Sequence, residues 1–201
     1  LLRRLLHERG GIDPADVEVR FDAPTKEMTE RLLHPALSFF LIEAMENTDL
    51  RQGGPGPARM MAEGQSTRRM PPRRIDLRYV VSAITTDSGD EHRLLWRTLA
   101  TLLRWPQLPA DLLPDFSRLI EAPITARVAQ PDEAGGSFEL WSGLGVSPRL
   151  SFSYILTVPM DLEITFSAPL VLTRTTRYVR SSIGDADTRQ AIGGFVRDAD
   201  G

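Results

Sequence analysis

The chain of 201 residues has the length of one domain, or of one domain with an extension. Its composition, 41% apolar and 25% charged with a formal net charge of −3, is that of an ordinary soluble protein. The absence of cysteine excludes disulfides, thiolate catalysis and thiolate-bound zinc, and no apolar run reaches the ~18 residues of a membrane span.

The first fifty residues predict a helix followed by two strands. LLRRLLHERG, residues 1–10, reads as an amphipathic helix that ends at a glycine pair. VEVRF, residues 17–21, alternates apolar and charged side chains with the period of a half-buried strand, its inward side being Val17, Val19 and Phe21. LSFFLI, residues 37–42, favours a strand buried on both faces, with a helix as the alternative.

Residues 51–74 are rich in Gly, Pro and Arg and show no apolar period, so we expect a long irregular connector. They hold six arginines and one acid, Glu63. An irregular segment of this length inside a compact domain is usually functional or disordered.

The middle of the chain predicts a strand and then a long helix. Apolar residues alternate from 75 to 83, which indicates one buried face of a strand. From Leu94 to Leu103 they recur at helical spacing, and Trp105-Pro106 stops the run. Core packing is the expected role of the three tryptophans, with interface anchoring as the alternative: Trp96, Trp105 and Trp141.

The start of this helix carries a polar cluster with two interpretations. Ser88 and Glu91 have the spacing of a capping box, in which the serine oxygen and the glutamate carboxylate each accept one free N–H. Asp90 and Glu91 also favour the positive end of the helix dipole. The competing hypothesis is a small hydrolase or metal enzyme that uses Asp87, Asp90, Glu91 and His92. We expect the helix start, with His92 facing solvent.

The rest of the chain predicts more extended structure. We expect strands at 124–130 and 150–160, a short helix at 137–145 and further extended chain at 161–180. The last fifteen residues are polar and Gly-rich and suggest a tail. This order of elements predicts an α+β fold with a mixed sheet flanked by helices.

Signatures of known enzyme classes are missing. No HExxH, GxSxG, GxGxxG or GxxxxGK[ST] motif occurs, so we predict no catalytic residue, cofactor or metal. The arginines of 51–74 leave three interpretations: a solvated linker, a protein contact, or a nucleic-acid-binding module that uses Arg68 to Arg74. The segment holds no Phe, Tyr, Trp or His on which bases could stack, which disfavours nucleic acid.

Four blocks in a fixed order carry a family likeness: FDAPT, EHRLL, QPDE with LWSGLG, and SYILTVP. Their succession resembles the tail-terminator, or cap, proteins of extracellular contractile injection systems of the antifeeding-prophage type. The likeness runs from about residue 10 to residue 180. EAMEN, residues 43–47, and the longer, arginine-rich 51–74 segment depart from the expected pattern.

The resemblance implies a structural, non-enzymatic protein without cofactors. Such caps form a six-fold ring on the last layer of inner tube and sheath, with a mixed, mainly antiparallel sheet flanked by helices. We therefore expect one cap domain at 1–180 and a tail at 181–201. Assembly is expected in the cytoplasm, in an injection particle that is either released or retained. The expected assembly interface comprises Arg68, Arg69, Arg73, Arg74, Arg174, Arg177 and Arg180.

Overall fold

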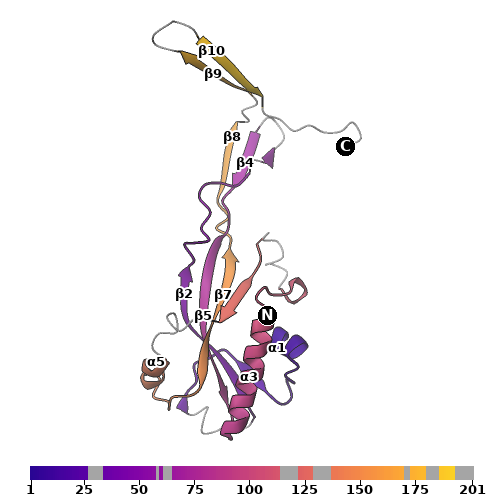
Figure 1. Ribbon diagram of the computed structural model, residues 1–201, viewed down its shortest axis with the longest axis vertical. Coiled ribbons are helices and arrows are strands. Elements are labelled where there is room, and N and C mark those ends of the chain that lie inside the picture. The colour runs from indigo at the N-terminus through magenta and orange to yellow at the C-terminus, as the bar shows by residue number, and fades with distance from the viewer. Residues whose placement is uncertain are drawn as a thin grey trace. The chain divides into compact units, whose positions relative to one another are not determined.

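The computed structural model describes residues 1–26, 34–57, 59–60, 65–113, 122–128, 137–169, 173–179 and 186–192. Figure 1 labels its principal helices and strands. In chain order the elements are α1 (Leu2–Gly10), β1 (Glu18–Arg20), β2 (Ala36–Glu46), β3 (Arg59–Met60), β4 (Gln65–Arg69), β5 (Arg73–Ile84), α3 (Ser88–Arg104), η2 (Ala110–Leu112), β6 (Thr125–Val128), α5 (Ser137–Gly143), β7 (Ser151–Met160), β8 (Thr165–Pro169), β9 (Thr173–Val179) and β10 (Ala186–Ile192).

The chain divides into two compact units. Unit 1 comprises Leu1–Gly53 and Pro72–Leu162, and unit 2 comprises Gly54–Pro71 and Glu163–Gly201. This division differs from the expected single domain at 1–180 with a tail at 181–201. No helix in the described part of the chain is both long and apolar enough to cross a membrane.

Unit 1 is built on a five-stranded sheet with the strand order β1-β2-β5-β7-β6. Only β1 and β2 run parallel, and the remaining neighbours are antiparallel. The long strand β5 pairs with β2 on one side and with β7 on the other. The predicted α+β class, with a mixed and mainly antiparallel sheet, is confirmed.

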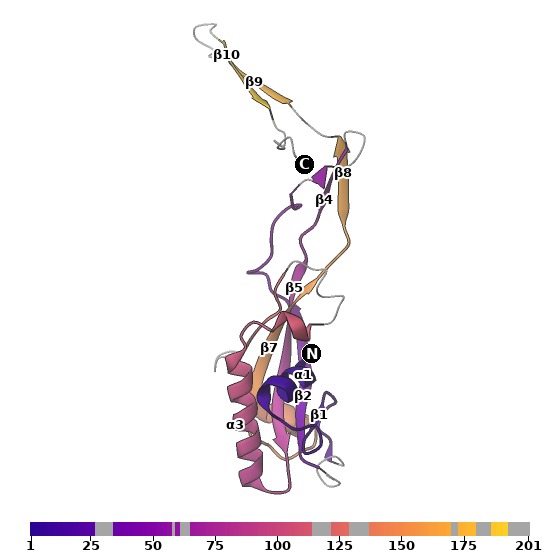
Figure 2. The ribbon, with the colours of Figure 1, turned by 90° about the vertical axis from the view of Figure 1, so that its right-hand side faces the viewer.

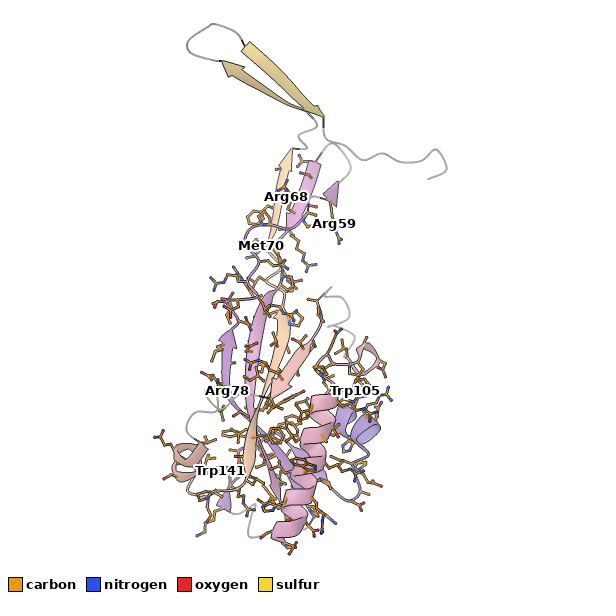
Figure 3. All side chains as sticks on the ribbon, viewed as in Figure 1. Arg59, Arg68, Met70, Arg78, Trp105 and Trp141 are labelled. Carbon is orange, nitrogen blue, oxygen red and sulfur yellow. The ribbon has the colours of Figure 1, made fainter. Side chains whose placement is uncertain are left out.

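Helices cover both faces of this sheet. The main core joins α1 and α3 to one face, with Val81 of β5 fully buried in it. The preceding residue, Val80, points to the opposite face and packs with Trp141 of α5. Figures 1 and 2 show α3 running alongside the strands with α1 next to it. Trp105 and Trp141 belong to the cores on the two different faces (Figure 3).

The end of α1 is fitted closely to α3. Gly11 caps α1 in the left-handed conformation with φ 60°, which glycine adopts at little cost. A Cβ atom there would lie 2.8 Å from Nη2 of Arg97, whose guanidinium donates to the carbonyls of Gly10 and Gly11. The predicted helix end at the glycine pair is therefore confirmed, and the glycine also makes room for the arginine.

Strand β2 is longer and less buried than its sequence predicts. Leu37, Ser38 and Phe39 are fully buried, as expected of a strand covered on both faces. Leu41 and Ile42 are 41% and 37% exposed, so the expected burial is wrong for the second half of 37–42. The register of β2 against β5 shifts between Leu41 and Glu43, and the short β1 pairs only with residues 36–38.

Two segments expected to be irregular contain strands. Residues 51–74 hold β3, β4 and the first residues of β5, and β4 pairs with β8 about one hundred residues later. Residues 186–192 of the expected tail form β10, which pairs with β9. Strand β4 has one buried residue, Ser66, and pairs through backbone hydrogen bonds, so no apolar period marks it in the sequence.

Candidate assembly surfaces

The first residue of α3 is preceded by an aspartate cap. Asp87 is extended, and its Oδ1 accepts a hydrogen bond of 3.0 Å from the backbone N–H of Asp90. Its carbonyl accepts from the N–H of Glu91, which is the first bond of the helix. Ser88 already lies inside the helix, so the expected capping box of Ser88 and Glu91 is wrong. Aspartate and serine are equally good caps, and the sequence places both at this boundary.

Glu91 instead binds a residue that lies far away in the sequence. Nη1 of Arg149 donates to Oε2 of Glu91 at 2.8 Å, and the two side chains are only 21% and 13% exposed. Nε of Arg149 is buried and has no hydrogen-bond partner among the described residues. The pair therefore fixes the first turn of α3 to the segment that leads into β7.

The remaining polar residues of this cluster serve the fold or face solvent. Asp90 pairs with Arg93 one turn later on the surface, and His92 is exposed, as expected. In the described parts of the chain, no three His, Asp or Glu side chains are placed to hold a metal ion. His7, in α1, contacts the carbonyl of Ile12 at 2.8 Å. Asp87, Asp90, Glu91 and His92 therefore do not form an assembled site in the described structure.

Replacing Glu91 with alanine is expected to lower the free energy of unfolding by about 2 kcal/mol. Exposed pairs contribute about 1 kcal/mol or less, and breaking a buried pair costs about 3–5 kcal/mol. The Glu91–Arg149 pair is intermediate between an exposed and a fully buried pair. The substitution leaves the mostly buried Arg149 guanidinium without its anionic partner. Urea unfolding followed by circular dichroism measures the change. Asp90→Ala is the matched control, because its pair is 77% and 57% exposed, and an equal loss in both variants contradicts this account.

The arginines expected at an interface divide between the two units. Arg73 pairs with Glu46 at 3.4 Å, and Arg74 donates to the carbonyl of Pro123. Burial lowers the pKa of the Arg74 guanidinium from its usual range. Both side chains thus have partners inside unit 1, at the end of the sheet.

The other expected interface arginines belong to unit 2. Arg68 and Arg69 are exposed on β4, and Figure 3 labels Arg68 beside Arg59 of β3. Arg174 and Arg177 lie on β9, in register with Ala191 and Thr188 of β10. Arg180 lies outside the described residues. An interface role for these residues remains a prediction.

Unit 2 contains a small sheet with the order β3-β4-β8 and almost no core. Ser66 is the only buried residue among those of unit 2 whose side chains the structure describes. Arg68 lies opposite Phe166, which is 50% exposed, and Ile164 is 43% exposed. Such a sheet gains little from its own packing, and its exposed apolar residues are typical of a surface that a partner covers.

Strands β9 and β10 form a second, separate sheet of unit 2. They pair along seven residues each, from Thr173 opposite Ile192 to Val179 opposite Ala186. Neither strand is paired with β3, β4 or β8 in the described residues. An isolated two-stranded ribbon is marginally stable in water, which again favours a partner surface.

Unit 1 exposes apolar residues at two places. Trp96 is 73% exposed on α3, so the expected core role is wrong for this tryptophan, whereas Trp105 and Trp141 do pack in the cores. It borders a groove of about 620 Å³ between α3 and the start of β7. The second place is the outer half of β2, where Leu41, Ile42 and Met45 are each exposed by more than a third.

Comparison with known proteins gives a family match and two similar solved structures. Residues 1–174 match the family model described as the Pvc16 N-terminal domain. The fold is similar to a sheath/tube terminator of an extracellular contractile injection system, PVC, in its extended state, with a TM-score of 0.62, 22% identity and coverage of 90% of this chain. It is also similar to the tube-terminating cap of the anti-feeding prophage, with a TM-score of 0.57, 23% identity and 81% coverage.

This chain is shorter than those structural relatives. It covers 61% of the PVC terminator chain and 53% of the anti-feeding prophage cap chain. No curated protein matches the sequence.

Proposed function

Because the chain belongs to the family described as the Pvc16 N-terminal domain, we propose that it is the structural cap, or tail terminator, of a phage-tail-like contractile injection particle. In this role it forms a ring of about six copies that ends the inner tube and joins it to the sheath. The ring assembles in the cytoplasm on a growing particle. Its work is binding and positioning, without catalysis.

The observation that carries the proposal is the family match over residues 1–174, together with a fold similar to two terminators of contractile injection systems. A cap has to bind its own copies and the end of another polymer, so it needs several surfaces that its own fold leaves uncovered. On one face of the unit 1 sheet, α1 and α3 pack against the strands and form a buried core within the chain itself. The sheet of β3, β4 and β8, with Phe166 exposed, is suited to partner binding.

Unit 2 is the part we assign to the tube and the sheath. Its sheet of β3, β4 and β8 exposes Phe166 beside Arg68, which combines an apolar contact with a guanidinium able to form bidentate bonds to carboxylates. Extended segments with unpaired backbone edges commonly bind by adding to a neighbouring sheet. The ribbon of β9 and β10 fits the same use.

The proposal is tested with the tube protein of the same injection particle. We expect tubes polymerised in the presence of the cap to stop growing, so that their mean length falls as the cap concentration rises. A soluble protein of similar size is the control, and tube lengths are measured by negative-stain electron microscopy. Unchanged tube lengths at an excess of cap over tube ends, together with no cap bound to sedimented tubes, would reject the proposal.

A further inference from the structure

The groove beside Trp96 is open, apolar and rimmed by basic side chains. Its floor and walls include Trp96 and Leu99 of α3 together with Leu150 and Phe152 at the start of β7. Trp96 is 73% exposed and Leu150 is 53% exposed, so large apolar groups face solvent on both walls. Uncovered tryptophan in a concave apolar site is typical of a binding hot spot.

The rim of this groove is positively charged. Arg93 and Arg97 lie on it, four residues apart on α3 and therefore about 6 Å apart along the helix. Arg93 is 77% exposed while its partner Asp90 is 57% exposed, so the cation of this pair faces solvent more than the anion does. None of the described residues that line the groove is acidic.

A second exposed apolar patch is bordered by acidic side chains. It comprises the outer half of β2 and the turn that follows, with Leu41, Ile42, Met45 and Leu50 exposed by 37% to 48%. Its carboxylates differ in exposure: Glu46 is 30% exposed and is bound by Arg51, which is 47% exposed, whereas two other carboxylates face outward. Glu43 is 41% exposed against 22% for its partner Arg78, and Asp49 is exposed in the turn. We call this surface the β2 patch.

The groove and the β2 patch lie on opposite sides of the central strand of unit 1. In the strand order, β2 flanks β5 on one side, and β7 flanks it on the other with α3 alongside (Figure 1). A closed ring of identical chains needs two different surfaces on each copy, one of which fits the other on the next copy. An apolar groove with a basic rim and an apolar strand edge with outward carboxylates satisfy this requirement.

We propose that the α3–β7 groove of one copy receives the β2 patch of the next copy, and that this contact closes the ring. Trp96 and Phe152 cover the apolar side chains of β2, and Arg93 approaches Glu43 and Asp49. Arg97, whose guanidinium already donates to the carbonyls of Gly10 and Gly11, adds its positive charge to the rim. The inference rests on the proposed cap function, because it assigns the lateral contact of that ring. Unit 2 takes no part in this lateral contact and remains available to bind the tube and the sheath.

The contact is tested with a photoreactive side chain, p-benzoylphenylalanine, in place of Trp96. Isotope-labelled and unlabelled copies are mixed and assembled on tube ends before irradiation, and the cross-linked peptides are identified by mass spectrometry. We expect cross-links between labelled and unlabelled copies that join position 96 to residues 41–50. Cross-links that reach only tube or sheath protein, or no second copy in particles that carry the cap, overturn the proposal.

Two substitutions on α3 provide a matched measurement. Trp96→Glu is expected to weaken self-association by about tenfold or more, because it places an acid opposite the carboxylates of the β2 patch. Leu103→Glu, also on an exposed residue of α3 but outside the groove, is expected to leave association within about twofold. Thermal unfolding shows whether both variants keep the fold. Equal association of the two folded variants contradicts the inference.

Failure of this inference is distinguishable from failure of the cap function. If the wild-type chain never binds tube ends, the cap function is wrong. If it binds tube ends and limits their growth while position 96 cross-links elsewhere, only the groove contact is wrong.

Discussion

Replacing Phe39 with alanine is expected to lower the free energy of unfolding by about 3–5 kcal/mol, the usual cost of removing a buried aromatic ring. Phe39 is fully buried at the point where β2 meets the main core. Its ring centroid lies 6.0 Å from that of Phe21 and 6.4 Å from that of Tyr79. The cavity left by alanine therefore opens between the sheet and the segment that follows β1.

Phe21→Ala is the matched control for this substitution. Phe21 is 39% exposed and stacks on the same ring, with the guanidinium of Arg3 5.2 Å from its centroid. Because much of this ring already contacts water, its removal is expected to cost about 1 kcal/mol. Urea unfolding of the two variants measures both values. A cost for Phe39→Ala no larger than that for Phe21→Ala would contradict the burial of Phe39 in the main core.

Ending the chain after Pro169 is expected to preserve unit 1 and to weaken capping of tube ends. The truncation removes β9, β10 and three of the arginines expected at an interface, Arg174, Arg177 and Arg180. In the described residues β9 and β10 pair only with each other, so their loss takes no strand from the sheet of unit 1. We expect the melting temperature to change by about 2 °C or less, which corresponds to under about 1 kcal/mol.

The tube-length assay measures the functional half of this prediction. The truncated chain is expected to need at least about tenfold more protein to shorten tubes, since a lost contact worth 1.4 kcal/mol weakens binding tenfold. A full-length variant with Arg174, Arg177 and Arg180 replaced by glutamate tests whether charge alone carries the contact. If the truncated chain shortens tubes at the same concentration as the wild type, β9 and β10 do not belong to the docking surface.

The parts of the fold that bury one face were predictable from the sequence. Apolar residues alternate along β5 and β7, and the alternate side chains Tyr79, Val81, Tyr154 and Leu156 do lie in the main core. The long helix follows in the same way from its 3.6-residue period, and Trp105 marks its end. In each case the buried positions require apolar side chains, so the spacing of apolar residues along the sequence indicates the type of element.

The sheets of unit 2 could not be predicted in this way. Strand β4 reads QSTRR, with one buried residue, Ser66, and its partner β8 lies far along the chain. Nothing in a local window marks such pairing, because β4 and β8 are joined by backbone hydrogen bonds and their described side chains are mostly exposed. The division of the 51–74 arginines between the two units likewise depends on tertiary contacts that a local window does not contain.

Two side chains of α3 show the limits of spacing as a guide to function. Ser88 had the spacing of a cap, yet Asp87 one residue earlier takes that position, because both types accept the same hydrogen bond. Trp96 was expected in a core because large aromatics usually are, and it is 73% exposed beside a groove. Only the position of β7 shows that this tryptophan borders an open apolar surface.

The most direct test of the cap function is an image reconstruction of tube ends assembled with this chain and with the cognate sheath protein. The account predicts a closed ring of about six copies on one end of every capped tube, with unit 2 against tube and sheath and unit 1 in contact with its neighbours. Bare tube ends, with the chain remaining a monomer in the same sample by light scattering, would contradict it.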